Sequence, residues 1–295
     1  MRKIYTQKNS GIICPIQKYD TFLTEDMTIM KKLIFTLMLL VFTAGTCFAD
    51  GLNIAKPGDF VNYKVGTQRG TIAEGLAKKL LGDKAKSQLT TYEKATDVVQ
   101  ALKVGKIQCA IMDEAPANQF VKNDPETLKI LPEALTVEQY AIGFKQGNKE
   151  LLDAVNKALA EIKADGSLEK IMLKYKEDPT AAKPEDIDLH KGAAGGKLYV
   201  GTESGFPPYD IKVGDGYTGI DIEMCALIAG KLNKELVIIA YPFDSLFMAV
   251  NSGKVDMICA GITVNEERKM FTDFSDPYED AKQVGLILTK EYAGE

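Results

Sequence analysis

The 295-residue chain has no tryptophan and only one histidine, His190. Because His190 lies in a stretch rich in Gly and Pro, no Ser/His/Asp or Cys/His nucleophile can be assembled around a core histidine. Long apolar runs are also missing, since the segment 33–42 has only ten residues and a membrane-spanning helix needs about 20. The composition therefore argues against a histidine-based hydrolase and predicts a soluble mature protein.

Cysteine is scarce, with five residues in the chain. Three of them, Cys109, Cys225 and Cys259, lie inside apolar segments and lack the spacing of metal ligands. We expect buried thiols and no metal or cofactor. A disulfide between Cys225 and Cys259 is the alternative.

The N-terminal region has the pattern of a secretory signal peptide. A basic start at residues 30–32 precedes the apolar run 33–42, and small residues follow up to Ala49, after which we expect cleavage. Residues 1–29 are interpreted as an upstream extension and are excluded from the fold. Lipidation at Cys47 is a less favoured alternative, because the residues before it lack the leucine of a lipoprotein cleavage site.

The charge balance is acidic. The chain has 36 Lys and Arg against 41 Asp and Glu, and removal of residues 1–49 leaves 30 against 38, a net charge of −8. An acidic surface argues against nucleic acid and anionic membranes as partners.

Strand-like and helix-like segments alternate along the chain, which predicts an α/β fold with mainly parallel sheets. The predicted strands are 63–67, 88–92, 107–112, 198–202, 236–241 and 255–259. The predicted helices are 71–81, 95–103, 220–232 and 245–251, with a further pair within 149–175 that is interrupted at Gly166 and resumes with a Ser cap.

Two short motifs occur in both halves of the chain in the same order. They are Val65-Gly66-Thr67-x-x-Gly70 with Val200-Gly201-Thr202-x-x-Gly205, and Ala101-x-x-x-Gly105-Lys106 with Ala249-x-x-x-Gly253-Lys254. The segment between the halves contains Pro179, Pro184 and a Gly/Ala run and has no apolar periodicity, as is typical of a linker. The repetition predicts two related lobes.

Charged and aromatic residues follow the predicted strands. Because ligands of open parallel sheets collect at the carboxyl ends of the strands, these are candidate site residues. They combine a guanidinium and a helix N-terminus for a carboxylate with acids for an ammonium, and so suit a zwitterion. Taken singly, Arg268 is more simply a surface charge, Thr71 a helix cap and Asp113 a capping acid. The full set of candidates is Gln68, Thr71, Asp113, Glu203, Phe206, Thr263 and Arg268.

These motifs resemble those of the polar amino-acid-binding proteins of ABC importers, solute-binding protein family 3. Residues 198–290 resemble the first lobe of that family through Val200-Gly201-Thr202-Glu203, Pro207-Pro208-Tyr209, Thr218-Gly219-Ile220-Asp221 and Phe274-Ser275-Asp276-Pro277-Tyr278. Residues 63–178 resemble the second lobe and the closing helices through Gly70-Thr71, Met112-Asp113-Glu114 and Lys174-Tyr175. The resemblance implies a two-lobed type II periplasmic-binding-protein fold with a hinge.

The order of the lobes is the reverse of the family's order, which predicts a circular permutation. The expected divisions are the second lobe at 50–141, the closing helices at 142–178, a permutation linker at 179–196 and the first lobe with its return toward the hinge at 197–295. Surface termini that lie close together can be exchanged without altering the core. A misassembled reading frame is the alternative.

The resemblance also implies roles at the backbone end of an amino-acid ligand. Arg268 is expected to grip the α-carboxylate, helped by Thr263 and the backbone N–H of Thr71. Asp113 and the carbonyl of Gly261 are expected to hold the α-ammonium.

For the ligand side chain, the resemblance implies an aromatic slot between Phe206 and Phe243, with Glu203 and Gln68 near the tip. Ile72 stands where the family often has a hydroxyl residue, so one contact differs. A ring-lined slot with an acid at its end favours arginine or lysine, with glutamine or cystine as alternatives.

The expected function is therefore that of a monomeric periplasmic protein that captures a polar amino acid, delivers it to an ABC permease and has no chemistry of its own. An enzyme of the cyclohexadienyl or prephenate dehydratase type, or an extracellular sensor, would be an alternative on the same fold.

Overall fold

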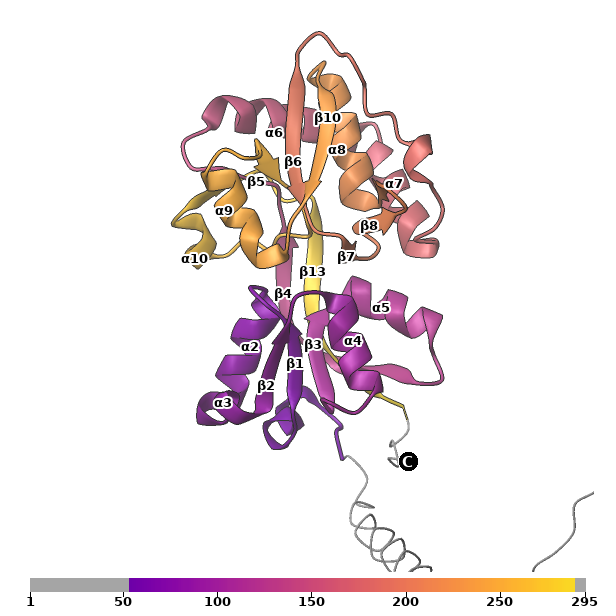
Figure 1. Cartoon of the computed structure of the whole chain (residues 1–295), viewed down its shortest axis with the longest axis vertical. Coiled ribbons are helices and arrows are strands. Elements are labelled where there is room, and N and C mark those ends of the chain that lie inside the picture. The colour runs from indigo at the N-terminus through magenta and orange to yellow at the C-terminus, as the bar shows by residue number, and fades with distance from the viewer. Residues whose placement is uncertain (1–52, 290–295) are drawn as a thin grey trace, which may run out of the picture. The chain divides into compact units, whose positions relative to one another are not determined.

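The computed structural model describes residues 53–289, which contain two sheet-based lobes (Figure 1). The predicted signal peptide, the cleavage after Ala49 and the alternative lipidation at Cys47 lie outside the described residues.

Lobe A is built on a five-stranded sheet in the order β2-β1-β3-β13-β4. Its strands are β1 (Val65–Gln68), β2 (Leu89–Tyr92), β3 (Cys109–Asp113), β4 (Leu128–Tyr140) and β13 (Glu279–Leu288). Its helices are α2 (Ile72–Leu81), α3 (Ala85–Gln88), α4 (Ala95–Lys103) and α5 (Glu114–Asn123), with the 3-10 turns η1 (Pro57–Asn62) and η2 (Gly82–Lys84).

Both faces of the lobe A sheet are covered at β3, since this strand is buried along its whole length. Successive side chains of a strand point to opposite faces. Accordingly, Cys109 and Ile111 pack in the cluster that contains α2, whereas Ala110 and Met112 pack in the cluster that contains α4. Gly66 in β1 allows this packing, since a Cβ there would lie 2.2 Å from the Ile107 side chain.

Lobe B has a five-stranded sheet in the order β10-β6-β11-β5-β12 and a small ribbon β7-β8-β9. The sheet strands are β5 (Gly143–Lys145), β6 (Lys197–Thr202), β10 (Glu235–Ala240), β11 (Met257–Ile258) and β12 (Thr272–Phe274), and the ribbon is β7 (Gly205–Phe206), β8 (Asp210–Val213) and β9 (Gly216–Thr218). The helices are α6 (Lys149–Ala164), α7 (Ser167–Glu177), α8 (Ile220–Lys231), α9 (Leu246–Asn251) and α10 (Glu266–Lys269), with η3 (Pro184–Asp186) and η4 (Phe243–Ser245).

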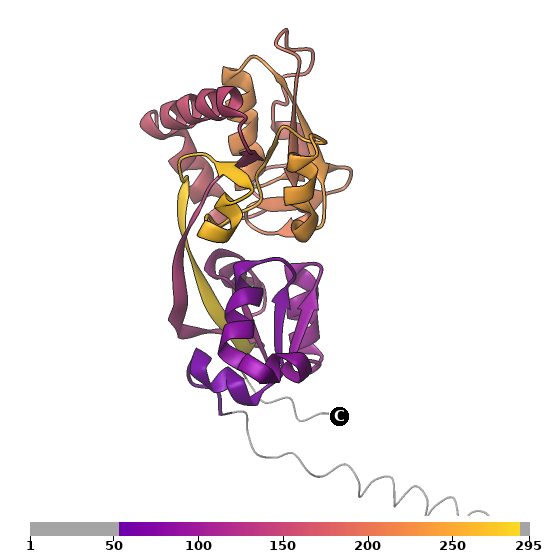
Figure 2. The ribbon, with the colours of Figure 1, turned by 90° about the vertical axis from the view of Figure 1, so that its left-hand side faces the viewer.

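Two strands, β4 and β13, run between the lobes and lie side by side in both views (Figures 1 and 2). They pair antiparallel from Glu279 opposite Tyr140 to Leu288 opposite Leu128. Beyond this ladder, Tyr140 forms an isolated bridge with Thr263 of lobe B. The two strands form the connection at which a hinge motion between the lobes is expected.

The predicted alternation is confirmed, and the helices and strands that were predicted begin and end within two residues of the observed ones. The expectation of mainly parallel sheets is wrong: β2-β1-β3 and β10-β6-β11 are parallel, whereas β13, β4, β5 and β12 join the two sheets antiparallel, because the strands that cross between the lobes add to the sheets in the opposite direction. One local prediction is wrong: Ser167 does not cap the second helix of the pair but is its first residue. Gly166, with φ of 76°, takes the cap position, and the Asp165 side chain accepts a hydrogen bond from the Ser167 backbone N–H at 2.9 Å. The turn is therefore stabilised by an aspartate that follows the first helix.

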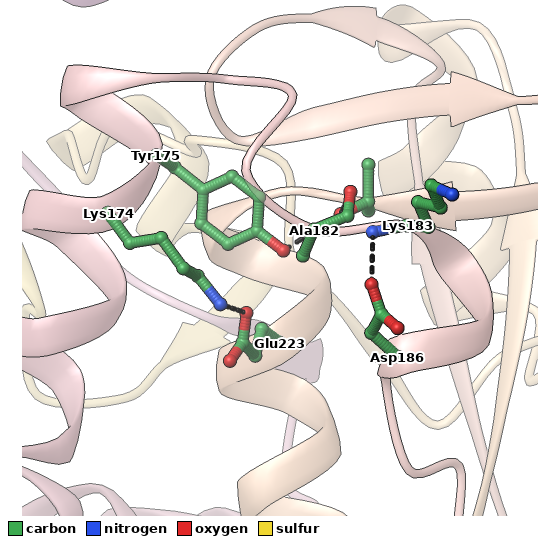
Figure 3. Close-up of polar contacts among 7 residues, drawn as sticks. Lys174, Tyr175, Ala182, Lys183, Asp186 and Glu223 are labelled. Carbon is green, nitrogen blue, oxygen red and sulfur yellow. Dashed lines mark hydrogen bonds and ion pairs between the residues drawn. The ribbon is translucent and has the colours of Figure 1, made fainter.

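The segment after α7 is fixed to lobe B by side-chain hydrogen bonds (Figure 3). The hydroxyl groups of Tyr175 and Thr218 lie 2.8 Å apart, and Thr218 donates to the carbonyl oxygen of Ala182 at 3.2 Å. In the same view, Lys174 forms an ion pair with Glu223 of α8. This part of the predicted linker is therefore packed against the lobe.

The same anchoring continues toward β6. The Lys183 backbone N–H donates to the Asp186 carboxylate at 2.9 Å, which closes the η3 turn (Figure 3). Ile187 is buried in the lobe B core, and the Leu236 N–H donates to the Leu189 carbonyl at 2.9 Å. The segment lacks a regular helix or strand beyond η3, as its composition predicts, and it is nevertheless well packed.

The prediction of buried thiols is confirmed, because Cys109, Cys225 and Cys259 are buried and free. The alternative disulfide between Cys225 and Cys259 is not formed. Between residues 53 and 289, no helix combines the length and the apolar character needed to cross a bilayer.

Candidate ligand-binding site

A cavity lies where strand ends of lobe A face strand ends of lobe B. Its volume is about 10 Å³, room for about one water molecule, so the lobes must move apart to admit a larger ligand. Eight of the nine predicted site residues line it, together with Ile72 and Gln283; the eight are Gln68, Thr71, Asp113, Phe206, Phe243, Gly261, Thr263 and Arg268. The ninth, Glu203, lies behind Gln68 and lines a neighbouring space.

Arg268 is a buried guanidinium, with 6% of its surface exposed. Asn265 caps its short helix by accepting the Arg268 N–H at 2.7 Å, which orients the side chain inward. The guanidinium donates to the carbonyl oxygens of Thr263 at 2.7 Å and of Gly70, across the cavity in lobe A, at 3.1 Å. Within residues 53–289 it forms no ion pair with a carboxylate.

Burial lowers the pKa of Arg268 to about 10, although Asp113 and Glu138 act in the opposite direction. The guanidinium is also stacked on aromatic rings, with its central carbon 5.5 Å from the Phe243 centroid and 5.0 Å from the Phe247 centroid. A desolvated cation held by carbonyls and rings can still accept an anionic partner.

Asp113 lies at the end of β3 and is 7% exposed. Its carboxylate accepts hydrogen bonds from the hydroxyl of Tyr140 and from Gln283 Nε2, the latter at 2.8 Å. Burial raises the pKa of Asp113 to about 7, and the charge of Glu138 acts in the same direction. A cation placed beside Asp113 would therefore stabilise the charged carboxylate.

Glu203 and Gln68 join the two lobes through a hydrogen bond of 2.5 Å between Glu203 Oε2 and Gln68 Nε2. Glu203 is 2% exposed, and its Oε1 has no hydrogen-bond partner in the described part of the chain. Burial raises the pKa of Glu203 to about 7. Gln68 thus lines the cavity, whereas Glu203 supports it from outside the lining.

The turn that opens α2 approaches lobe B closely. Gly70, with φ of 76°, allows this, because a Cβ there would lie 2.9 Å from the Cβ of Asp244. Thr71 is the N-cap of α2, and its hydroxyl donates to the Gln68 carbonyl at 2.7 Å. The helix N-terminus therefore faces the cavity, where free N–H groups favour an anion.

The aromatic residues are placed on separate supports. The Phe206 ring stacks on Tyr209, with centroids 5.4 Å apart and an interplanar angle of 26°. Gly261 lies against Phe206, since a Cβ at position 261 would be 2.5 Å from the ring. The Phe243 ring packs against the guanidinium of Arg268. Both predicted rings line the cavity.

Thr263 is already engaged in a hydrogen bond. Its hydroxyl donates to Glu138 Oε2 at 2.7 Å. Because a hydroxyl has one hydrogen, Thr263 must release Glu138 before it can donate to a ligand carboxylate.

Two residues near the cavity were missed by the sequence analysis. Gln283 lines the cavity and is 1% exposed, and the half-buried Glu138 accepts hydrogen bonds from Thr263 and Gln283. The available signal was a glutamine directly before the apolar run 284–288 of β13. In the described ranges, no group of three or more His, Cys, Asp or Glu side chains could hold a metal ion.

Comparison with known proteins gives segment matches. An arginine-binding extracellular protein of Bacillus subtilis is 36% identical over 98 residues, 33% of this chain and 38% of that protein. A probable histidine-binding protein of Campylobacter jejuni is 36% identical over 91 residues, 31% of this chain and 36% of its own. An L-cystine-binding protein of Escherichia coli is 32% identical over 118 residues, 40% of this chain and 43% of its own.

The chain thus spans less than half the length of these curated relatives, all of which are binding proteins by name. The family model of the bacterial extracellular solute-binding proteins, family 3, matches residues 3–178 and 198–293. These two segments include most of the chain and all the residues that line the cavity. The chain belongs to the bacterial extracellular solute-binding proteins, family 3.

Proposed function

We propose that the protein binds one polar amino acid between its lobes outside the cytoplasm and delivers it to an ABC permease. The observation that carries the proposal is a pair of buried, opposite charges on one cavity. Arg268 and Asp113 line the same space, and neither forms an ion pair within residues 53–289. A zwitterion supplies the missing partner of both.

The ligand α-carboxylate takes the place of the Gly70 carbonyl on Arg268 and accepts from the backbone N–H of Thr71. Guanidinium and carboxylate match as a bidentate pair, which makes this contact directional. The α-ammonium goes to Asp113 and the carbonyl of Gly261. The orientation of the ligand is fixed by these two ends before any side chain is recognised.

Closure of the lobes is the step that the ligand favours. Gln68 with Glu203 and Arg268 with Gly70 join the lobes in this structure, so the ligand-free chain has a closed state with contacts of its own, in which the cavity is too small for an amino acid. A ligand that touches both lobes replaces part of these contacts, binds a closed state preferentially and shifts the population toward it. Delivery to the permease then follows from a surface that exists only when both lobes are together.

The charge around the cavity favours a cationic side chain. Asp113, Glu138 and Glu203 contribute three carboxyl groups against the guanidinium of Arg268 and the ammonium of Lys94 beside Glu203, and a zwitterion adds no net charge. Arginine or lysine brings one further positive charge and therefore gains more than glutamine or cystine, the competing ligands. The names of the matched relatives include arginine- and histidine-binding proteins, which is in keeping with this preference.

We further propose that the chain is a circularly permuted family member exported to the periplasm as a monomer after cleavage at Ala49. The family model matches in two segments separated at residues 179–197, where the predicted linker lies. Ile54 and Ile287, near the two ends of the described chain, pack in one cluster of lobe A. Two chain ends that pack in the same cluster lie close together, as circular permutation requires.

A thermal-shift screen against the twenty amino acids tests the binding proposal. A ligand at 100 times its dissociation constant stabilises the folded state by about 2.7 kcal/mol, which is readily measured. Arginine or lysine is expected to give the largest shift, and the Asp113→Asn variant should lose it. No shift with any of the twenty would contradict the proposed function.

A further inference from the structure

Gln283 occupies the junction of three strands beside the cavity. In β13 it lies opposite Asp113 of β3 and opposite Thr136 of β4, and the β4 ladder shifts register between Gln283 and Val284. Such irregularities commonly redirect a side chain next to a functional site. The side chain is among those that line the cavity.

The amide of Gln283 separates two carboxylates. Its Nε2 donates to Asp113 Oδ1 at 2.8 Å and to Glu138 Oε2 at 3.3 Å. Because carboxylates offer oxygens only, the NH₂ group must be the side that faces them, which fixes the orientation of the amide. The amide oxygen therefore points away from both acids.

That oxygen, Gln283 Oε1, is buried and has no hydrogen-bond partner in the described part of the chain. A buried acceptor without a partner is costly, and native proteins seldom leave one unpaired. The α-ammonium expected at Asp113 carries three N–H groups, more than one carboxylate oxygen and one carbonyl can accept. An acceptor beside Asp113 is what such a ligand requires.

We propose that Gln283 is a specificity-determining residue whose amide oxygen accepts a hydrogen bond from the ligand α-ammonium while its NH₂ group holds Asp113 and Glu138 in place. Glu138 in turn accepts from Thr263 of lobe B, whose carbonyl holds Arg268. One hydrogen-bonded path thus connects the groups proposed for the two ends of the ligand. This inference rests on the proposed amino-acid binding and adds a requirement for an α-amino group.

A cycle of protein variant and ligand analogue tests the contact. The wild type and Gln283→Met are titrated by calorimetry with L-arginine and with 5-guanidinopentanoic acid, which is arginine without its α-ammonium. Gln283→Met should lose about 10- to 100-fold in affinity for arginine, the range for a hydrogen bond to a charged group. Its affinity for the analogue should differ from that of the wild type by less than about threefold, because the analogue has no α-ammonium for Gln283 to contact.

A purely structural role for Gln283 predicts equal losses for both ligands, and that result would overturn the inference. Gln139→Met is the matched control, since Gln139 is on the same strand pair but is exposed and bonded to Asp280. If Gln283→Met does not fold, Gln283→Asn is used in its place, because its shorter side chain keeps the amide but moves it away from the ligand. The expected result is the same: a loss of affinity for arginine and little change for the analogue.

Failure of this inference is distinguishable from failure of the proposed function. A wild type that binds an amino acid, with Gln283→Met within threefold of it, overturns only the role of Gln283. A wild type that binds none of the twenty overturns both. If the wild type prefers glutamine to arginine, L-glutamine and glutaramic acid form the ligand pair and the expected coupling is unchanged.

Discussion

Replacement of Arg268 by alanine is the most direct perturbation of the proposed clamp. The guanidinium is 6% exposed and holds two carbonyl oxygens, so a ligand carboxylate bound there is desolvated as well. Loss of one partner from a buried charged pair costs about 2 to 5 kcal/mol, which corresponds to roughly 30- to 5,000-fold in affinity. Calorimetry with L-arginine measures this loss.

The same replacement also affects the ligand-free protein. Without Arg268, the carbonyls of Thr263 and Gly70 lose their donors, which costs on the order of 2 kcal/mol and lowers the melting temperature by roughly 4–8 °C. Arg268→Lys keeps the charge but not the planar fork, so we expect an intermediate loss of affinity. The variants therefore separate charge from geometry.

Arg69→Ala is the matched control for Arg268. The Arg69 side chain is 52% exposed and lies 3.8 Å from Asp244 of the other lobe. Such an exposed pair contributes up to about 1 kcal/mol, so affinity should fall no more than about fivefold. A change of threefold or less in Arg268→Ala, or equal losses in the two variants, would refute the reasoning.

The remaining predictions concern pH, specificity and chain order. The pKa values of Asp113 and Glu203 are raised to about 7 by burial, so the folded protein binds more protons than the unfolded chain above about pH 4. The ligand-free protein should therefore lose stability as pH rises from 5 to 8, on the order of 5 kcal/mol for the two carboxyls together, while arginine affinity increases over the same window. A melting temperature independent of pH would argue against this. Glu203→Gln should lower the affinity for arginine at least about tenfold and leave the affinity for glutamine nearly unchanged. The control Glu93→Gln, at an exposed acid that lines the same space as Glu203, should have little effect on either affinity. Equal losses of affinity for both ligands in Glu203→Gln would exclude the cationic preference. A chain with residues 197–295 placed ahead of 50–178 should fold and bind the same ligand, as measured by circular dichroism and calorimetry, and failure to fold would contradict the permutation.

The sequence predicted the fold class and most of the cavity because both follow from local patterns. Strands such as β3 are short apolar runs, and in parallel sheets the residue after such a run lies at the ligand-binding edge. Asp113, Thr263 and Arg268 were found in this way, and Phe206 follows β6 by the same rule. The family resemblance added Phe243 and Gly261, which follow β10 and β11 and have no distinctive local signal.

Contacts between distant segments could not be predicted. Gln283 is 170 residues from Asp113 and 145 from Glu138, and nothing in a single sequence pairs these positions. The engagement of Thr263 by Glu138 depends on how β4 passes lobe B, which no periodicity encodes. The same limit applies to Glu203, whose carboxylate accepts a hydrogen bond from Gln68, 135 residues away in the chain.

The order of the lobes decides which of them is continuous in sequence. In this chain every strand of the lobe B sheet falls between residues 143 and 274, whereas lobe A combines strands from 65–140 with β13 from the C-terminal end. With 197–295 placed first, β13 would precede β1, so lobe A would become continuous and lobe B would be divided. If the rearranged chain folds as proposed, every strand is expected to keep the neighbours it has here, with β4 and β13 as the two crossings. The connection between the lobes and the cavity therefore depend on which strands pair. The order of the lobes in the chain determines only which lobe forms its sheet from one continuous segment.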